Sequence, residues 1–178
     1  LFLAASGAAA QEAALIHVAT VANTVDYVTY LDDPLLNGRP AAILFVTPVH
    51  RGVHNPHPIA VFYYAAFSSW LIENQDLADI PLGSAFHVWI PTPTALAPRQ
   101  PAFVHTVSAA NTPGGIYSEL DHFWINNNPN AKVHATAVRG PAYVPWQVIL
   151  EYDPASDRWC AHPPSASTPW TNGTELHV

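Results

Sequence analysis

The chain has 178 residues, of which 49% are apolar and 11% are charged, so it can bury a hydrophobic core and a disordered chain is excluded. Six Lys and Arg against 13 Asp and Glu give a formal charge of -7 without any basic run, which excludes the electrostatic surface that nucleic acids require. Eighteen prolines and six tryptophans, with no methionine, favour short strands and turns over long helices. The sequence therefore predicts an all-β fold with short loops and little helix.

The N-terminal segment resembles the end of a secretory signal peptide. Residues 1–5 are apolar, and residues 8–10 are alanines that precede Gln11. We therefore expect export and a secreted, extracellular location. The segment is too short to span a bilayer, so no membrane span is expected. Residues 1–14 are predicted to be either a signal remnant or a retained apolar arm that docks on a neighbouring subunit through Leu1, Phe2 and Leu3.

The chain contains an internal repeat. Residues 17–24 (HVATVANT) match residues 105–112 (HTVSAANT), and 105 minus 17 gives a spacing of 88. The spacing becomes 89 where Trp70 matches Trp159, and 90 at the end of the second copy. We predict two homologous β modules, residues 15–90 and residues 103–178, joined by a proline-rich linker over residues 91–102.

Turn residues divide each copy into runs of strand length. Asn37-Gly38 precedes the apolar run 41–46, which needs cover on both faces and so indicates a β-sandwich or barrel. Residues 148–152 and 158–161 flank a turn and predict a hairpin, and we expect the same hairpin at 63–71. The two modules are predicted to be sandwich-like and related by a pseudo-two-fold axis, either as two small sandwiches or around one shared core.

The first copy carries motifs of a known kind at residues 45–47 (FVT), 57–63 (HPIAVFY) and 70–76 (WLIENQD). These resemble an uncharacterised family of secreted bacterial tandem-repeat β modules, whose repeats carry HPIGVWY-type and IFNQD-type segments. The second copy lacks the Asn-Gln-Asp segment. The resemblance implies this architecture and export, and no established activity.

Ten histidines include two groups of candidate metal ligands. One group lies in a loop rich in proline and glycine, where the spacing suits zinc or copper but also suits a solvent-exposed turn: His50, His54 and His57. The other group opens and closes the two copies at equivalent places: His17, His87, His105 and His177. Equivalent places suggest equivalent roles, either hydrogen bonding across a sheet or metal binding. The structural role is favoured, so no cofactor is expected, and a metal ion is the alternative.

Signals for catalysis are weak, and we expect that the protein is not an enzyme. Its carboxylates lie mostly in turns, and no nucleophile elbow or phosphate loop occurs: Asp32, Asp33, Asp76, Asp79, Glu119 and Asp121. Three aromatic residues are candidates for a platform that binds sugar rings: Trp124, Trp170 and Tyr64. The single cysteine, Cys160, is expected to be a buried apolar residue.

Three functions follow from these features. The first, which we favour, is a secreted non-catalytic structural protein that self-assembles into an extracellular filament or tube, with the N-terminal arm docking on the next subunit. The second is an extracellular carbohydrate- or surface-binding module, and the third is a histidine-rich metal-binding protein. The first function predicts a homo-oligomer or polymer, and the second predicts a carbohydrate partner.

Overall fold

The computed structural model describes residues 13–91, 102–140, 142–165 and 168–178. Residues 1–12 of the predicted arm (1–14) and residues 92–101 of the predicted linker (91–102) lie outside these residues, whereas Ala13 and Ala14 begin the first strand. The described residues form thirteen strands and one short 3-10 turn, Pro113–Gly115, so the prediction of an all-β fold is confirmed. In these residues no helix has the length and apolar character needed to cross a membrane.

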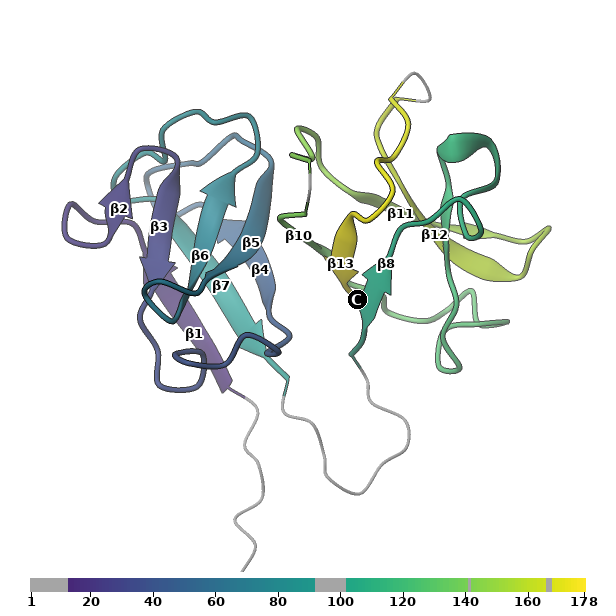
Figure 1. The fold of residues 1–178 in the computed structure, drawn as a ribbon, viewed down its shortest axis with the longest axis horizontal. Coiled ribbons are helices and arrows are strands. Elements are labelled where there is room, and N and C mark those ends of the chain that lie inside the picture. Colours follow the sequence, from purple (N-terminus) through teal and green to yellow (C-terminus); the bar gives the residue numbers. More distant parts are fainter. Residues whose placement is uncertain (1–12, 92–101, 141, 166–167) are drawn as a thin grey trace, which may run out of the picture.

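The first module is a β-sandwich (Figure 1). Its strands are β1 (Ala13–Val18), β2 (Thr24–Val25), β3 (Val28–Leu31), β4 (Phe45–Val49), β5 (Ile59–Tyr64), β6 (Ser69–Asn74) and β7 (Ala85–Ile90). One layer has the order β1-β7-β4, and the facing layer has the order β2-β3-β6-β5. The hairpin predicted over residues 63–71 is confirmed as the antiparallel pair β5 and β6.

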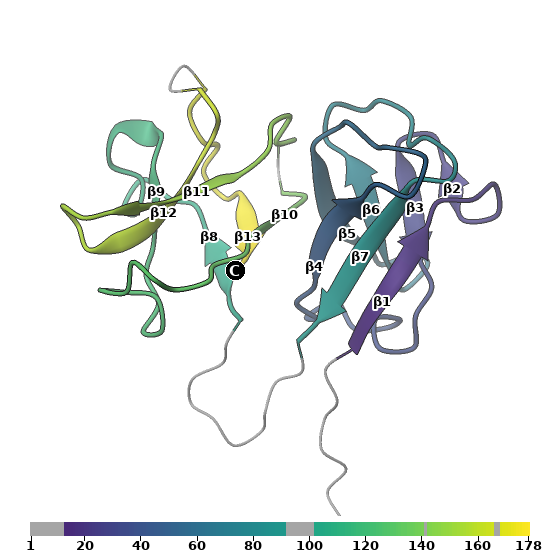
Figure 2. The same ribbon diagram turned by 180° about the vertical axis from the view of Figure 1, so that it is seen from behind.

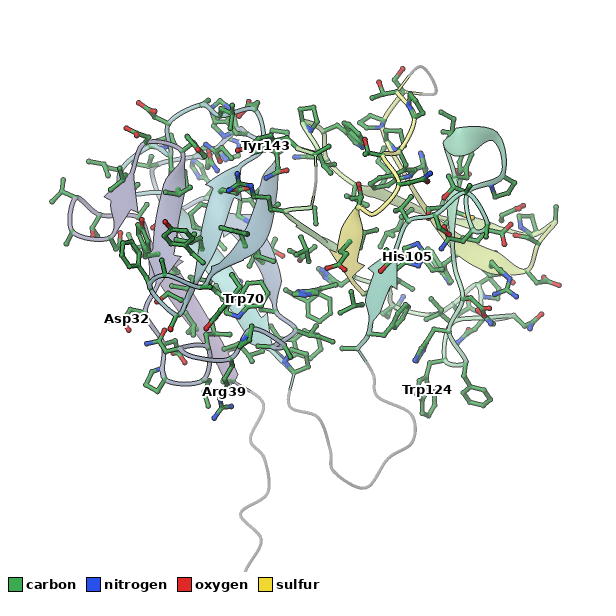
Figure 3. All side chains as sticks on the ribbon, in the orientation of Figure 1. Asp32, Arg39, Trp70, His105, Trp124 and Tyr143 are labelled. Atoms are coloured by element: carbon green, nitrogen blue, oxygen red, sulfur yellow. The ribbon has the colours of Figure 1, made fainter. Side chains whose placement is uncertain are left out.

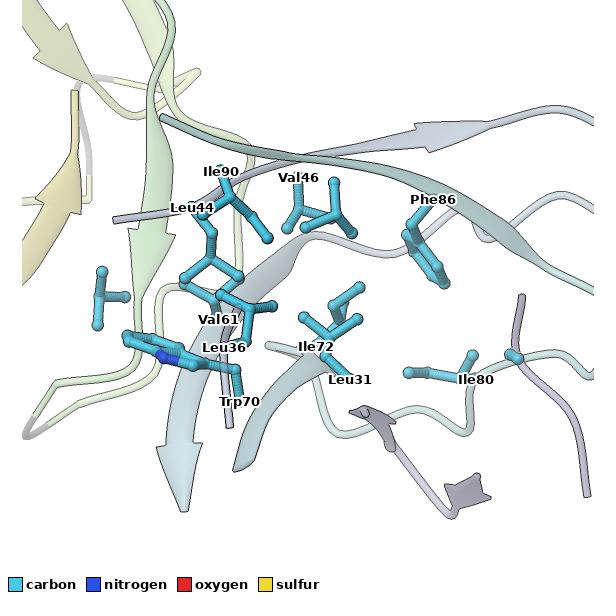
Figure 4. Close-up of a cluster of buried hydrophobic side chains, with 13 residues drawn as sticks. Leu31, Leu36, Leu44, Val46, Val61, Trp70, Ile72, Ile80, Phe86 and Ile90 are labelled. Carbon is cyan, nitrogen blue, oxygen red and sulfur yellow. The ribbon is translucent and has the colours of Figure 1, made fainter. Parts of the chain in front are cut away.

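Alternation along the strands builds the core of the first module. In β7, Phe86, Val88 and Ile90 are buried in the cluster between the two layers, while His87 points to the opposite face. Ile72 of the facing sheet is fully buried in the same cluster (Figure 4). The core thus explains why these strands are rich in large apolar residues.

The second module repeats six of the seven strands of the first, and β2 has no counterpart among the described residues. It contains β8 (Val104–Thr106), β9 (Ser118–Leu120), β10 (Thr136–Val138), β11 (Ile149–Asp153), β12 (Arg158–His162) and β13 (Glu175–His177). The neighbours β8-β13-β10 correspond to β1-β7-β4, and β9-β12-β11 correspond to β3-β6-β5. The predicted hairpin over 148–161 is confirmed as β11 and β12.

The repeat extends to single hydrogen bonds. The indole N–H of Trp70 donates to the Arg39 carbonyl at 2.9 Å, and that of Trp159 donates to the Asn128 carbonyl at 3.0 Å (Figure 3 labels the first pair). Each indole thus ties the same loop to the same strand in its own module. The two tryptophans are equivalent anchors of the fold.

A single sheet runs through both modules. Strand β10 adds in parallel to β5, with Ala137 opposite Ala60 and Val138 opposite Val61. The Arg139 N–H donates to the Val61 carbonyl at 2.9 Å. The result is a seven-stranded sheet of order β2-β3-β6-β5-β10-β13-β8, which Figure 1 and Figure 2 show from its two sides.

The two cores lie on opposite faces of this shared sheet. Val138 comes from the second module but belongs to the core cluster of the first, and Ala60 of the first module belongs to the cluster of the second. Adjacent residues of a strand point to opposite faces, so one sheet supports both cores. Each core therefore depends on a residue of the other module.

The modules meet through different surfaces. The first module uses the edge of β5, whereas the second uses β10, the counterpart of β4. A two-fold axis would also pair β11 with β4, but in the described part of the chain these strands pair only with β12 and β7. The predicted pseudo-two-fold relation therefore does not describe the strand pairing, and the contact is heterologous.

Candidate functional site

A buried polar network holds the two modules together. The carboxylate of Glu73 is fully buried and accepts a hydrogen bond from Gln75 Nε2 at 2.7 Å. It also forms an ion pair with Arg139, with Nη1 at 3.4 Å from Oε2. Gln75 Oε1 accepts the Val144 N–H at 2.8 Å. Arg139 also donates to the Tyr143 hydroxyl at 3.0 Å. Glu73 and Gln75 of the first module thus bind Arg139 and Val144 of the second.

The pKa of Glu73 is raised above its ordinary value, because the effect of burial is larger than the opposing effects of the Arg139 guanidinium and the Gln75 amide. The Arg139 guanidinium also lies 4.8 Å from the centre of the Phe62 ring, which favours a cation at this place. Tyr143, labelled in Figure 3, covers part of Arg139, whose side chain is 33% exposed. The site stabilises a charge pair inside the module contact.

A second set of contacts lies on the other face of the shared sheet. His177 Nδ1 lies 3.2 Å from the Leu44 nitrogen and 3.0 Å from its carbonyl oxygen, so it bonds to one of them according to its tautomer. Thr136 Oγ1 accepts the Val46 N–H at 3.1 Å. Side chains of β13 and β10 therefore bind the backbone at the start of β4. We call His177 and Thr136 the inner acceptor pair.

The first module carries the same two side chains on its own outer face. His87 corresponds to His177, and Thr47 corresponds to Thr136. Both are exposed, opposite each other on β7 and β4, and make no hydrogen bond through their side chains within the described residues. We call His87 and Thr47 the outer acceptor pair.

The outer acceptor pair lines a groove of about 570 Å³ on the outer face of β1-β7-β4. The Phe45 ring stacks on the Trp89 ring, with centroids 5.1 Å apart, and His134 of the second module lies at 6.4 Å from Phe45. We call this feature the His87 groove, lined by Ala14, Leu15, Ile16, Phe45, Thr47, His87, Val88, Trp89 and His134.

The equivalent histidines His17 and His105 have equivalent structural roles. His17 Nε2 bonds to the Thr29 hydroxyl at 2.7 Å, and His105 Nε2 bonds to the Ser118 hydroxyl at 2.8 Å. Burial lowers the pKa of both histidines. The first and last strands of each module do pair, but His17 faces Phe86 rather than His87, so the histidines do not bond to each other across the sheet.

The loop histidines do not converge. His50 and His54 are exposed with ring centroids 6.1 Å apart, while His57 Nδ1 bonds to Asp76 at 2.7 Å. Among the residues that the structure describes, no three or more His, Cys, Asp or Glu side chains gather as metal ligands would. The geometry therefore gives the predicted metal sites no support.

The three predicted platform residues lie in different environments. Trp170 is only 7% exposed, donates to the Ala161 carbonyl and packs against Trp146, so its prediction as an exposed platform is wrong and it is a core residue. Trp124 is 50% exposed and projects from the second module (Figure 3). Tyr64 is exposed on β5, beside the exposed ring of Phe67 at 5.1 Å.

The candidate carboxylates are bound to neighbouring groups. Asp32 and Asp121 each accept a hydrogen bond from an asparagine five residues later, at 2.7 Å. Asp33 accepts the Leu35 N–H, and Glu119 faces Arg158. Asp79 takes part through its backbone carbonyl, which accepts from the Asn74 side chain. These contacts serve turns and strand neighbours.

Cys160 is buried, as predicted. Burial and the nearby carboxylates, Glu119 first among them, raise the pKa of its thiol to about 11. A thiol with so high a pKa is a poor nucleophile at neutral pH.

Sequence reasoning missed the module contact and its residues Glu73, Gln75 and Arg139. One signal was available, because the Glu-Asn-Gln stretch of the first copy is replaced by His-Pro-Pro in the second. A polar stretch that continues an apolar strand in only one copy indicates a role that only one copy performs. The outer acceptor pair was half predicted, since His87 was a candidate and Thr47 was not.

Comparison with known proteins gives a family and no annotated relative. Residues 6–90 and residues 60–161 match a domain of unknown function, DUF7452, in two stretches that overlap. No curated protein and no solved structure matches the chain. Since the two stretches together cover most of the sequence, the chain belongs to the DUF7452 family.

Proposed function

We propose that this protein is a secreted, non-catalytic structural subunit that self-assembles head to tail into an extracellular filament or tube. The observation that carries the proposal is the heterologous contact between the modules. Because the modules are homologous, each carries a version of both contact surfaces. Each module uses only one of them in the contact within the chain, so one copy of each surface stays unused. Repetition of such a contact between chains makes a ring or a filament.

The unused surfaces are on the described part of the chain. β11 is the counterpart of β5, the strand that receives β10, and it pairs there with β12 alone. Its first residue, Ile149, is 40% exposed. On the first module, β4 is the counterpart of β10 and ends its sheet. Exposed strand edges of this kind are common sites of association between chains.

The N-terminal segment provides a second contact in this proposal. Residues 1–10 are apolar and small, and they precede β1, an edge strand of the first module. An apolar segment gains about 25 cal/mol for each Å² that a neighbouring subunit covers. Secretion is part of the proposal and rests on the signal-like character of the same segment.

Light scattering and negative-stain electron microscopy of the purified protein test this function. We expect particles whose mass grows with concentration, and filaments or tubes at high concentration. A variant without residues 1–10 should remain folded and associate more weakly. A mass that stays at one chain over the whole concentration range would exclude self-assembly.

A second candidate is a carbohydrate- or surface-binding module, which one observation favours. Aromatic side chains cluster on the outer face of β3-β6-β5, with Phe67 at 62% exposed between Tyr30 and Tyr64. The corresponding positions of Tyr30 and Tyr64 in the second module are Glu119 and Asp153, so the repeat does not require aromatic residues there. Binding to a glycan array that is lost in Phe67→Ala tests this candidate.

A further inference from the structure

We propose that the His87 groove binds residues 129–135 of a second copy of this chain, with the outer acceptor pair holding the backbone of Val133 and Ala135. This inference rests on the proposed self-assembly and names its surfaces. The occupant follows from the contact that already exists inside the chain.

The inner contact is the template. There, the inner acceptor pair binds the backbone of Leu44 and Val46. At the spacing of 89 between the copies, Leu44 corresponds to Val133 and Val46 corresponds to Ala135. At the same spacing Thr136 corresponds to Thr47, and at the spacing of 90 His177 corresponds to His87. The equivalent contact therefore joins the second module of one chain to the first module of another.

The acceptor side of this contact is complete. His87 and Thr47 retain the residue types of the inner acceptor pair, although nothing in the described part of the chain bonds to their side chains. The groove around them is largely apolar, with Ile16 at 42% exposed and the stacked rings of Phe45 and Trp89.

The donor side is available as well. Residues 129–135 form no strand, and within the described residues the backbones of Val133 and Ala135 make no hydrogen bond. Pro129 and Ala131 match Pro40 and Ala42 of the segment that leads to Leu44. The residues that precede the donor nitrogens are thus similar in both copies.

The contact between chains lacks the strongest parts of the inner contact. Pro48 stands at the position of Ala137 and has no N–H for strand pairing. His162 and Pro164 stand at the positions of Glu73 and Gln75, so the buried charge pair has no counterpart. The side-chain hydrogen bonds and apolar groove remain, and the contact is therefore weaker and reversible.

Disulfide formation between separate chains tests the inference. Two variants are prepared, Thr47→Cys and Ala135→Cys, and are oxidised alone and as a mixture. The mixture should give a cross-linked dimer that neither variant gives alone, because the two surfaces differ. Cys160 is buried and does not compete. A chain with both Val46→Cys and Thr136→Cys is the matched control, since the template places these residues in contact and predicts a disulfide within the chain.

A second measurement uses the acceptor side chains. The double variant Thr47→Ala, His87→Ala should need at least about tenfold more protein for half association, since two hydrogen bonds are lost. The control Val21→Ala lies in an exposed loop and should leave association unchanged.

The outcomes separate the inference from the proposed function. Association without cross-linking in the mixture, or cross-linking of Thr47→Cys alone to the same extent, would overturn the inference and leave self-assembly standing. A wild-type protein that never associates would overturn both. Cross-linking specific to the mixture, with weaker association of the double variant, supports both.

Discussion

The side chain of Glu73 shows how single residues determine the relation between the modules. It is fully buried, and its hydrogen bond to Gln75 and ion pair with Arg139 both lie at the module contact. A buried carboxylate costs several kcal/mol unless it is paired, so removal of its partner is more harmful than replacement of the whole pair. The side chain of Arg139 is 33% exposed, which reduces that cost.

We predict that Arg139→Ala lowers the free energy of unfolding by about 2 kcal/mol at pH 7. Burial already raises the pKa of Glu73 above its ordinary 4.5, and loss of the guanidinium raises it further. A carboxyl with a raised pKa favours the fold below pH 4.5, and this contribution is lost as the pH rises. Urea unfolding should therefore show a larger loss at pH 7 than at pH 4.5.

The control for this prediction is the double variant Glu73→Gln, Arg139→Ala, which has no buried charge. It should be more stable at pH 7 than Arg139→Ala. Equal stability of the two variants would mean that the carboxylate of Glu73 finds another partner.

The buried histidines give a pH dependence of the opposite sign. Burial lowers the pKa of His17, His105 and His177 below 6.5. Their stabilisation is complete above pH 6.5 and is lost as the pH falls, by up to about 1.4 kcal/mol per pH unit for each histidine. Urea unfolding between pH 7.5 and pH 5.5 should show this fall, and His17→Gln together with His105→Gln should make it shallower. An unchanged slope in that variant would assign the fall to other groups.

At the scale of elements, β4 and β10 are equivalent strands that pair differently. Both are neighbours of the last strand of their module, yet only β10 joins the other module's sheet. In the ladder with β5, the backbone N–H of Arg139 donates to the Val61 carbonyl. Alternate residues of a strand direct their N–H groups to the same side, so the N–H of Ala137 also faces β5. At the corresponding position β4 has Pro48. Proline cannot donate a ladder hydrogen bond, so Pro48 weakens backbone pairing of β4 with another strand.

We predict that Pro48→Ala strengthens association between chains. The substitution restores an N–H at the position where β10 pairs with β5, so the edge of β11 in a second copy can add to β4. Half association should occur at a concentration several-fold lower than in the wild type, by light scattering at pH 7. Weaker or unchanged association would show that β4 does not face another chain's edge.

The sequence predicted much of what lies inside a module and little of what lies between modules. Hairpins such as β11 and β12 follow from local signals, namely apolar runs on both sides of a turn. The repeat predicted equivalent places for Trp70 and Trp159, and the structure gives them equivalent bonds. The burial of Trp170 was missed because its immediate neighbours in the sequence are mostly polar, while its partners Ala161 and Trp146 lie outside that local stretch.

The contact between β5 and β10 could not be predicted for a physical reason. Parallel pairing joins segments far apart in the chain, and its backbone hydrogen bonds do not depend on side-chain identity. A two-fold arrangement was the simplest expectation for two homologous modules. Instead Pro48 removes one of the two equivalent strand pairings, and the Glu73 network strengthens the other.

At the scale of the whole molecule, two sandwiches share one sheet and place their cores on its opposite faces. Val138 and Ala60 each complete the core of the other module, so we regard the pair of modules as one structural unit. The unit has two different unused surfaces: the outer acceptor pair in the His87 groove on the first module, and the edge of β11 with residues 129–135 on the second, of which His134 also lines the groove. Two different surfaces that are complementary to each other are the requirement for head-to-tail assembly.

The most direct test of head-to-tail assembly is sedimentation velocity of the wild-type protein over a hundredfold range of concentration at pH 7. Head-to-tail assembly predicts a sedimentation coefficient that rises with concentration, with dimers and longer species in reversible exchange. A single species with the mass of one chain at every concentration would contradict it.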